Sequence, residues 1–222
     1  MSEIAANIRA VRERIRAAAD RAGRSPHDIT LVGVSKAHPV SAAAEAFRAG
    51  LRDLGENRVQ EAGAKIIALR AAGSTPRWHL LGHLQRNKVR VALDLFDILH
   101  GVDSVRIAEA LSGNARRPVP ILIEVNVTGE ATKFGVAPGD LPSTVLRLRQ
   151  LPNIDVRGLM TVAPRVDNPE DVRPVFRALR TLRDRLELKH LSMGMSDDFE
   201  VAVEEGATLV RVGRAIFGAP VR

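Results

Sequence analysis

A lysine follows a short apolar run in the first quarter of the chain. Residues 31–34 are Leu-Val-Gly-Val, and Ser35, Lys36 and then Pro39 come after them. Mostly apolar residues with two β-branched valines predict a short buried strand, which Pro39 stops because proline has no backbone N–H to donate. An amine at the mouth of such a strand is costly unless a carbonyl or a phosphate lies there. Lys36 is therefore a candidate Schiff-base lysine. The alternative is a strand-end lysine whose charged head reaches water.

Further polar residues are expected where the other strands end. They are Asn57, His79 and His83, Asp103 and Ser104, Asn126, Thr161, Ser196 and Arg211. Each has a structural explanation on its own, because Asn57 and Ser104 can cap helices and the histidines can be satisfied interior residues. Together they would surround one site, which the separate explanations do not account for.

Two stretches near the C-terminus combine glycine with the start of a helix. Residues 192–198 and 212–218 each lead from an expected strand into a helix N-terminus. Loop amides and helix N-termini bind phosphate, Gly213 allows the backbone to approach closely, and the Ser196 hydroxyl can add a donor. Asp197 and Asp198 suit a helix N-terminus as well as a metal, and no carboxylate or histidine spacing supports a metal site. These stretches predict a phosphate site without a metal.

The elements that position these residues alternate along the chain. Strands are predicted near residues 31–34, 52–55, 78–82, 97–103, 119–127, 154–160, 190–193 and 208–212, and helices near residues 2–22, 41–49, 59–72, 85–95, 105–111, 140–150, 169–189 and 197–205. The fifth strand is apolar on both faces, which is typical of a covered parallel sheet. We predict one domain over residues 1–222, a (β/α)8 TIM barrel with its site at the carboxyl ends of the strands. An open doubly wound sheet is the alternative.

Composition narrows the class of partner. The 222 residues carry 33 Lys and Arg against 26 Asp and Glu, a net charge of +7. Single-strand nucleic-acid binders need aromatic platforms, but the chain has six Phe, one Trp and no Tyr, and its arginines are dispersed among acids. We therefore predict attraction for small anions and no nucleic-acid binding. The absence of cysteine excludes disulfides and thiolate metal sites.

The first 22 residues are rich in arginine and could be mistaken for a transit peptide. However, Ile4, Ile8, Val11 and Ile15 form a helical stripe, and acidic residues lie among the arginines. An amphipathic helix over residues 2–22, capped by Ser2 and packed on the barrel, is expected. No apolar run approaches the roughly 20 residues of a membrane span, so we predict a cytoplasmic protein without membrane contact.

Several motifs carry a family resemblance from the first strand to the last. They are Val34-Ser35-Lys36, Gly55-Glu56-Asn57 with Val59-Gln60-Glu61, Trp78-His79-Leu80 with Gly82, Gly158-Leu159-Met160, Leu191-Ser192-Met193-Gly194-Met195-Ser196, and Arg211-Val212-Gly213 with Ile216-Phe217-Gly218. By these motifs the chain resembles the pyridoxal phosphate (PLP) homeostasis proteins, which are similar to the barrel domain of alanine racemase (PLP fold type III). Arg58, Arg86 and Arg214 depart from the family's frequent residues. At Arg214 this puts only a side-chain contact with phosphate in doubt.

The resemblance implies a cofactor site. It implies that Lys36 forms the internal aldimine, that Ser196 and the amides of Gly213 and Arg214 hold the phosphate, and that Arg211 lies at the pyridine nitrogen. It also implies that Asn57 lines the ring. His79 and Thr161, as polar residues expected at strand ends, complete the predicted cofactor-binding set.

An arginine at the pyridine nitrogen favours a carrier over an enzyme. Arginine only donates, so the nitrogen stays unprotonated and stabilises a carbanion poorly. Two-base racemisation also needs a second acid, which in alanine racemase is a tyrosine from another domain, and this chain has no tyrosine. We predict a non-catalytic, monomeric PLP carrier that supplies PLP-dependent apo-enzymes. The alternatives are an amino-acid racemase or D-amino-acid aldolase, with His79 or His83 as the second acid, and a cofactor-free Schiff-base aldolase acting on a sugar phosphate.

Overall fold

The fold is a closed barrel of parallel strands, each followed by a helix. The structure is a computed structural model that describes residues 2–130 and 132–219. Within these residues the strands pair in chain order, and the last pairs with the first. They are β1 (Thr30–Val34), β2 (Asp53–Glu56), β3 (Arg77–Leu80), β4 (Ile98–Val102), β5 (Val119–Glu124), β6 (Ile154–Met160), β7 (His190–Ser192) and β8 (Leu209–Val212). The predicted (β/α)8 barrel is confirmed, and the open sheet is wrong.

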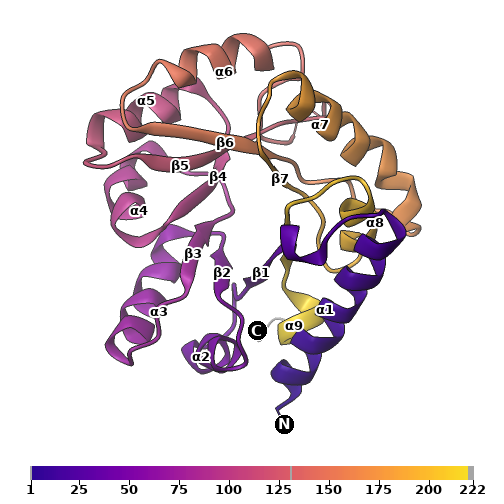
Figure 1. Cartoon of the computed structure of the whole chain (residues 1–222). Helices are drawn as coiled ribbons and strands as arrows, with labels where there is room; N and C mark the ends of the chain where they lie inside the picture. Colours follow the sequence, from indigo (N-terminus) through magenta and orange to yellow (C-terminus); the bar gives the residue numbers. More distant parts are fainter. Residues whose placement is uncertain (1, 131, 220–222) are drawn as a thin grey trace.

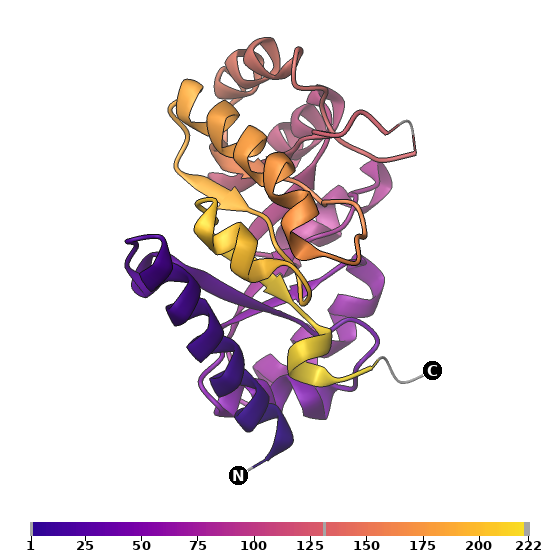
Figure 2. The same ribbon diagram turned by 90° about the vertical axis from the view of Figure 1, so that its right-hand side faces the viewer.

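The helices lie along the outside of the strands (Figure 1). They are α1 (Glu3–Arg21), α2 (Val40–Arg48), α3 (Val59–Ala71), α4 (Val89–Leu95), α5 (Val105–Asn114), α6 (Leu141–Arg149), α7 (Arg173–Arg185), α8 (Phe199–Glu204) and α9 (Arg214–Phe217), with 3₁₀ turns η1 (Pro26–Asp28), η2 (Arg86–Lys88) and η3 (Pro169–Val172). The loop between β5 and α6 projects beyond the helices (Figure 2). Residues 1, 131 and 220–222 of the predicted domain lie outside the described residues, so the domain limits of 1–222 stay a prediction.

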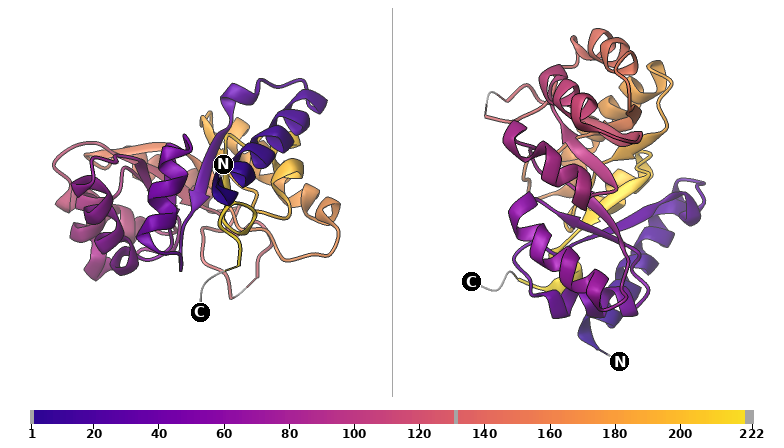
Figure 3. Two further views of the ribbon diagram at one scale, coloured as in Figure 1. Left: turned by 90° about the horizontal axis from the view of Figure 1, so that it is seen from below. Right: turned by 90° about the vertical axis from the view of Figure 1, so that its left-hand side faces the viewer.

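The side chains of each strand alternate between two apolar environments. Ile121 and Ile123 belong to the large core between strands and helices, whereas Leu122 belongs to a small cluster with Val32, Met160 and Leu209. Because successive side chains of a strand point to opposite faces, the small cluster lies inside the barrel. Arg211, two residues after Leu209, shares this inner face. Helices cover the outer face in both views of Figure 3.

The N-terminal helix forms as its sequence predicts. The Ser2 hydroxyl accepts a hydrogen bond from the Ala5 N–H, and Ile8, Val11 and Ile15 are buried. α1 thus packs as an integral part of the barrel, against α8 and α9. None of the described helices is long and apolar enough to cross a membrane.

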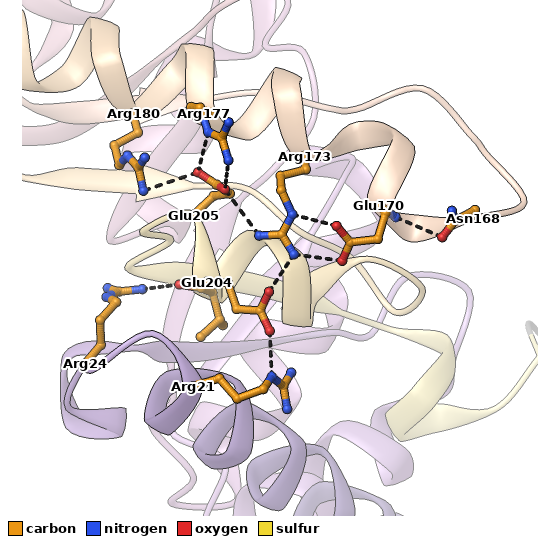
Figure 4. A network of polar contacts seen from close by, with 10 residues as sticks. Arg21, Arg24, Asn168, Glu170, Arg173, Arg177, Arg180, Glu204 and Glu205 are labelled. Carbon is orange, nitrogen blue, oxygen red and sulfur yellow. Dashed lines mark hydrogen bonds and ion pairs between the residues drawn. The ribbon is translucent and has the colours of Figure 1, made fainter.

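A network of charges fastens α1 and α7 to α8 (Figure 4). At its centre, Arg173 pairs with Glu170 at 2.6 Å, with Glu204 at 2.6 Å and with Glu205 at 3.2 Å. Arg21 of α1 pairs with the other oxygen of Glu204 at 2.7 Å. Several arginines that are dispersed among acids in the sequence are therefore paired with acids in the structure.

Two helices differ from their predicted limits. The helix expected over residues 169–189 starts as the 3₁₀ turn η3 and its α-helical part ends at Arg185. Glu187 then takes a left-handed conformation with φ of 50°, and the Leu188 N–H returns to the Arg183 carbonyl. Helices usually end this way at glycine, so the sequence carried no signal for this end. The helix expected over residues 85–95 likewise begins as η2.

Candidate functional site

Seven of the eight predicted site residues meet at one end of the barrel. They belong to five adjacent strands, since β6, β7, β8, β1 and β2 are neighbours in the closed sheet. Thr161 follows β6, Ser196 lies after β7, Arg211 is in β8 with Gly213 and Arg214 beyond it, Lys36 follows β1, and Asn57 follows β2. The carboxyl ends of parallel strands share one rim, so these residues form a single candidate site.

Lys36 is the exposed residue of a well-fixed strand end. Ser35 before it is fully buried, and the Ser35 N–H donates to the Gly55 carbonyl at 3.1 Å. Ala37 after it has a φ of 59°, a left-handed conformation that turns the chain away from the strand. Lys36 itself is exposed, and its amine has no partner among the described residues. The amine is thus presented at the rim and available to react.

A buried ion pair lies beneath Lys36. Lys65 Nζ is 2.5 Å from Glu56 Oε1 and donates to the Ser35 carbonyl at 2.7 Å. The Ser35 hydroxyl donates to the same Glu56 oxygen at 2.6 Å. Lys65 on α3 therefore holds the residue just before Lys36. Sequence reasoning missed this pair, although Glu56 was part of the Gly55-Glu56-Asn57 motif.

The loops after β7 and β8 come together as predicted for a phosphate site. The Ser196 hydroxyl accepts a hydrogen bond from the Ala215 N–H at 3.3 Å, at the first turn of α9. A Cβ on Gly213 would lie 3.2 Å from the Val34 carbonyl oxygen, so glycine permits the close approach of the β8 and β1 ends. The Arg214 guanidinium pairs with Asp197, and the Arg214 N–H belongs to the first turn of α9, where backbone donors have no intrahelical partner.

Arg211 is buried inside the rim and held at two points. Its Nη1 donates to the Ser192 hydroxyl at 2.6 Å, and its Nη2 donates to the Thr161 carbonyl at 2.8 Å. Burial lowers the pKa of Arg211 to about 10, against the opposing charges of Asp198 and Glu124. The guanidinium is therefore charged at neutral pH. It has five N–H donors, so donors remain for a ligand atom that accepts.

His79 does not join this rim. It lies within β3, is fully buried, and has both ring nitrogens in contact with other side chains. Nε2 is 2.9 Å from Asp53 Oδ1, and Nδ1 is 2.9 Å from His100 Nε2. Since neither nitrogen is open to a ligand, the geometry favours an indirect role for His79 over contact with a cofactor.

The end of β5, on the same rim, carries an acidic group that sequence reasoning missed. Glu124 ends the apolar strand β5, and burial together with nearby Asp103 raises its pKa to about 7. Asp103 Oδ2 lies 2.6 Å from Nδ1 of His83. The Phe134 ring stacks on His83 with centroids 4.3 Å apart. The sequence signal for Glu124 was a charged residue at the end of an otherwise apolar strand. Ser104 is the N-cap residue of α5, as predicted, but its hydroxyl donates to Asp103 at 3.1 Å and makes no cap hydrogen bond.

Comparison with known proteins first defines the class. The family described as alanine racemase, N-terminal domain, matches residues 6–220. The solved alanine racemases of Clostridium difficile 630 and Corynebacterium glutamicum are 20% and 22% identical, each with a TM-score of 0.72. This chain covers 56% and 62% of those chains, and 96% of this chain is aligned in both cases. At such identity the likeness shows the fold alone, an alanine racemase-like barrel.

Full-length relatives then define the family. The curated pyridoxal phosphate homeostasis protein of Aquifex aeolicus is 46% identical over 94% of both chains, and that of Pseudomonas aeruginosa is 46% identical over 99% of this chain and 96% of its own. The solved structure of PipY of Synechococcus elongatus with PLP bound has a TM-score of 0.83 and 38% identity, covering 97% of this chain and 100% of that chain. The chain belongs to the pyridoxal phosphate homeostasis protein family.

Proposed function

We propose that this chain binds PLP through Lys36 and carries or buffers the cofactor in intracellular PLP (vitamin B6) homeostasis, without robust catalysis. The observation that carries the proposal is the exposed Lys36 amine beside a buried guanidinium and two converging loops. PLP supplies an aldehyde for an amine, a phosphate for the loops, and a ring nitrogen for a donor. The names of the curated relatives and the PLP-bound PipY support the same conclusion.

In this proposal each side chain has one role. Lys36 holds the cofactor as a Schiff base. Ser196 and the N–H groups of Gly213 and Arg214 bind the phosphate, using the open amides at the start of α9. Arg211 donates to the pyridine nitrogen, and Asn57 lines the ring.

Thr161 of the predicted set acts indirectly, as do Glu56 and Lys65, which sequence reasoning missed. The Thr161 carbonyl orients Arg211, and the Thr161 hydroxyl donates to the Val125 carbonyl at 2.9 Å, which fixes that turn. Glu56 and Lys65 fix the strand end that precedes Lys36.

The chemistry of Arg211 supports a carrier. Arginine cannot pass a proton to the ring nitrogen, so the bound cofactor would stabilise a carbanion poorly. The alternative is a PLP-dependent racemase or D-amino-acid aldolase. Glu124, which ends β5 on the same rim and has a pKa of about 7, favours that alternative because a group that titrates near neutrality can move a proton.

The proposal extends to partners and location. We propose that the carrier is monomeric, acts in the cytoplasm and hands PLP to PLP-dependent apo-enzymes. The packing of α1 supports a cytoplasmic protein, because this arginine-rich segment is a structural element of the barrel. No nucleic acid or membrane takes part in this proposal.

The visible spectrum of the purified protein with added PLP tests the cofactor. We expect a yellow band that borohydride reduction converts into an adduct on Lys36, as found by peptide mass mapping. Lys36→Ala should abolish the band, while Lys189→Ala, at an exposed lysine before β7, should keep it. A colourless protein would instead favour the cofactor-free aldolase, and an adduct spread over surface lysines would contradict the proposed site.

A turnover assay separates the carrier from the enzyme. The PLP-loaded protein is incubated with single enantiomers of alanine, serine and threonine, and the chirality and cleavage of each are followed by chiral chromatography. The carrier predicts rates no higher than those of free PLP. Steady racemisation or cleavage that is lost in Glu124→Gln would replace the carrier with the enzyme.

A further inference from the structure

Five side chains are joined end to end across the inside of the barrel. Beginning at the rim, Arg211 Nη1 lies 2.6 Å from Ser192 Oγ, which lies 2.8 Å from His100 Nδ1. His100 Nε2 lies 2.9 Å from His79 Nδ1, and His79 Nε2 lies 2.9 Å from Asp53 Oδ1. Asp53 is the first residue of β2, so the row runs from the carboxyl end of the barrel towards its amino end. There Asp53 meets the exposed Arg77 at 2.7 Å.

The two ends of this row, together with neutral imidazole rings, fix the direction of every hydrogen bond. A guanidinium only donates, so the Ser192 oxygen accepts from Arg211 and its single proton is free for His100 Nδ1. A carboxylate only accepts, so His79 Nε2 carries a proton towards Asp53. His79 Nδ1 then accepts from His100 Nε2–H, provided that both rings are neutral. Both histidines are thereby set as Nε2–H tautomers.

Burial favours the neutral form of His100. Ser192, His79 and His100 are fully buried. The pKa of His100 lies well below its usual range. Burial is the main cause, and nearby positive charges add to it. A protonated His100 would donate on both sides, and the Ser192 proton would then lose its acceptor. With neutral rings all four contacts are made and the Ser192 proton also has an acceptor.

A polar row is an unusual filling for the inside of a barrel. Elsewhere on the inner face Val32, Leu122, Met160 and Leu209 pack as apolar residues, which is the common filling of such barrels. Apolar residues of similar volume would also be as stabilising as a buried polar network. Stability alone therefore gives no reason for two histidines at this place, and the row needs another role.

We infer that Ser192, His100, His79 and Asp53 form a one-way hydrogen-bond relay that positions Arg211. Arg211 has two acceptors in the structure, the Thr161 carbonyl and the Ser192 hydroxyl. The carbonyl is fixed by the backbone, whereas the hydroxyl is oriented by His100 and, through it, by His79 and Asp53. The relay thus sets which N–H of Arg211 faces the cofactor ring, a role that rests on the proposed PLP function. None of the four residues needs to touch the cofactor.

The tautomers of the two histidines test the relay without any cofactor. Long-range ¹H–¹⁵N correlation spectra of the ¹⁵N-labelled wild-type protein at neutral pH distinguish Nε2–H, Nδ1–H and charged rings. We expect both His79 and His100 as Nε2–H tautomers. A charged ring, or an Nδ1–H tautomer at either histidine, would overturn the directed relay whatever the protein binds.

PLP titrations then test the positioning role. Ser192→Ala removes the link beside Arg211, and His79→Phe breaks the relay at a residue that does not touch Arg211. We expect both variants to bind PLP about tenfold or more weakly than the wild type, with a shifted visible band. In His79→Phe we also expect His100 to populate both tautomers, because its Nε2–H has lost its acceptor.

Two controls keep the outcomes distinct. Ser112→Ala removes another buried hydroxyl, which lies on the outer helix α5 and donates to the Pro152 carbonyl at 2.7 Å, and should bind PLP as the wild type does. Asp53→Asn keeps an oxygen that accepts from His79 and should retain most of the PLP affinity. If Ser192→Ala and His79→Phe bind PLP as tightly as Ser112→Ala, the positioning role is wrong. If the wild type binds no PLP, the proposed function fails while the tautomers still decide the relay.

Discussion

Glu124 is a carboxyl group whose charge changes near neutral pH. Its folded pKa of about 7 lies above the usual 4.5, so the folded protein holds a proton that the unfolded chain releases between these values. The protonated Glu124 side chain stabilises the folded protein relative to its charged form. This contribution to the unfolding free energy is fully present below about pH 4.5 and is lost as the pH rises through 7. The shift corresponds to at most about 3 kcal/mol.

Glu124→Gln tests this pH dependence. The neutral amide has the same shape and no charge to bury, so the PLP-free variant should match the wild type near pH 4.5 and exceed its unfolding free energy by up to about 3 kcal/mol at pH 8. Urea unfolding at the two pH values measures the difference. Glu109→Gln, at an exposed residue paired with Arg147, is the control and should show little change. Equal stability of Glu124→Gln and the wild type at pH 8 would contradict the raised pKa.

The buried Glu56–Lys65 pair gives a second prediction for single residues. Lys65→Met leaves the Glu56 carboxylate buried without its counter-charge, and its Oε2 already has no hydrogen-bond partner in the described part of the chain. We expect a loss of about 3–5 kcal/mol in urea unfolding. The double variant Glu56→Gln with Lys65→Met removes both charges and should recover most of that loss. A double variant as unstable as the single one would show that shape, and not charge, matters here.

Residues proposed to bind the cofactor directly were predictable from the sequence. Residues that position them were not. Lys36, Ser196 and Gly213 are recognisable from their types and from the strand ends beside them. Lys65 lies within an amphipathic helix, where a lysine normally faces solvent. Only the packing of α3 on the β1 and β2 ends brings its amine to the Ser35 carbonyl.

At the scale of elements, close approach between strand ends shapes the rim. A Cβ on Gly82 would lie 2.3 Å from the Asn57 carbonyl oxygen, and a Cβ on Gly101 would lie 2.5 Å from the Gly82 carbonyl oxygen. The segments after β2 and β3 and the end of β4 are therefore in backbone contact. Any side chain at Gly82 must displace the backbone that carries Asn57.

Paired glycine substitutions test this contact. Gly82→Ala should lower the unfolding free energy by about 2 kcal/mol and weaken PLP binding, since Asn57 must move. Gly113→Ala, in α5 with nothing within 4 Å of the added Cβ, should stabilise by about 0.5–1 kcal/mol and leave PLP binding unchanged. Thermal unfolding and PLP titration of both variants measure the contrast. A Gly82→Ala protein as stable as Gly113→Ala would show that the rim is less tightly packed than the structure has it.

The elements themselves were largely predictable because hydrophobic pattern and turn residues agree in most of this chain. The strand at residues 154–160 is found as predicted, and the other strands differ by a few residues. The misplaced ends have physical reasons. α7 ends at a non-glycine left-handed residue, Glu187, and the apolar run of β5 continues past Glu124 as a single bridge between Val125 and Val136. Neither leaves a local signal in the sequence.

At the scale of the whole molecule, the barrel unites residues that are far apart in the sequence. His100 and Ser192 are 92 positions apart and share a hydrogen bond. A list of strand ends can place polar residues on one rim, as it did for Lys36 and Arg211. It cannot show that His79 points into the interior towards His100, because that depends on the stagger of neighbouring strands around the closed barrel.

The distribution of exposed apolar side chains predicts the oligomeric state. Within the described residues the large exposed apolar side chains are Val40, Ile67, Val91, Phe134, Leu146, Val162 and Val166, which lie on four helices and two loops. Stable homodimers generally bury a large apolar surface, and residues scattered in this way do not supply one. The positive net charge of +7 also opposes association of identical chains.

We therefore expect a monomer of 24.1 kDa with and without PLP. Size-exclusion chromatography with light scattering, over micromolar to near-millimolar protein and at low and high salt, measures the mass. Salt screens the repulsion between the chains, so association hidden by charge would emerge at high salt. A mass that stays constant supports one PLP site per independent carrier. A mass that doubles on adding PLP would mean that the rim which binds the cofactor is also the surface on which two copies meet.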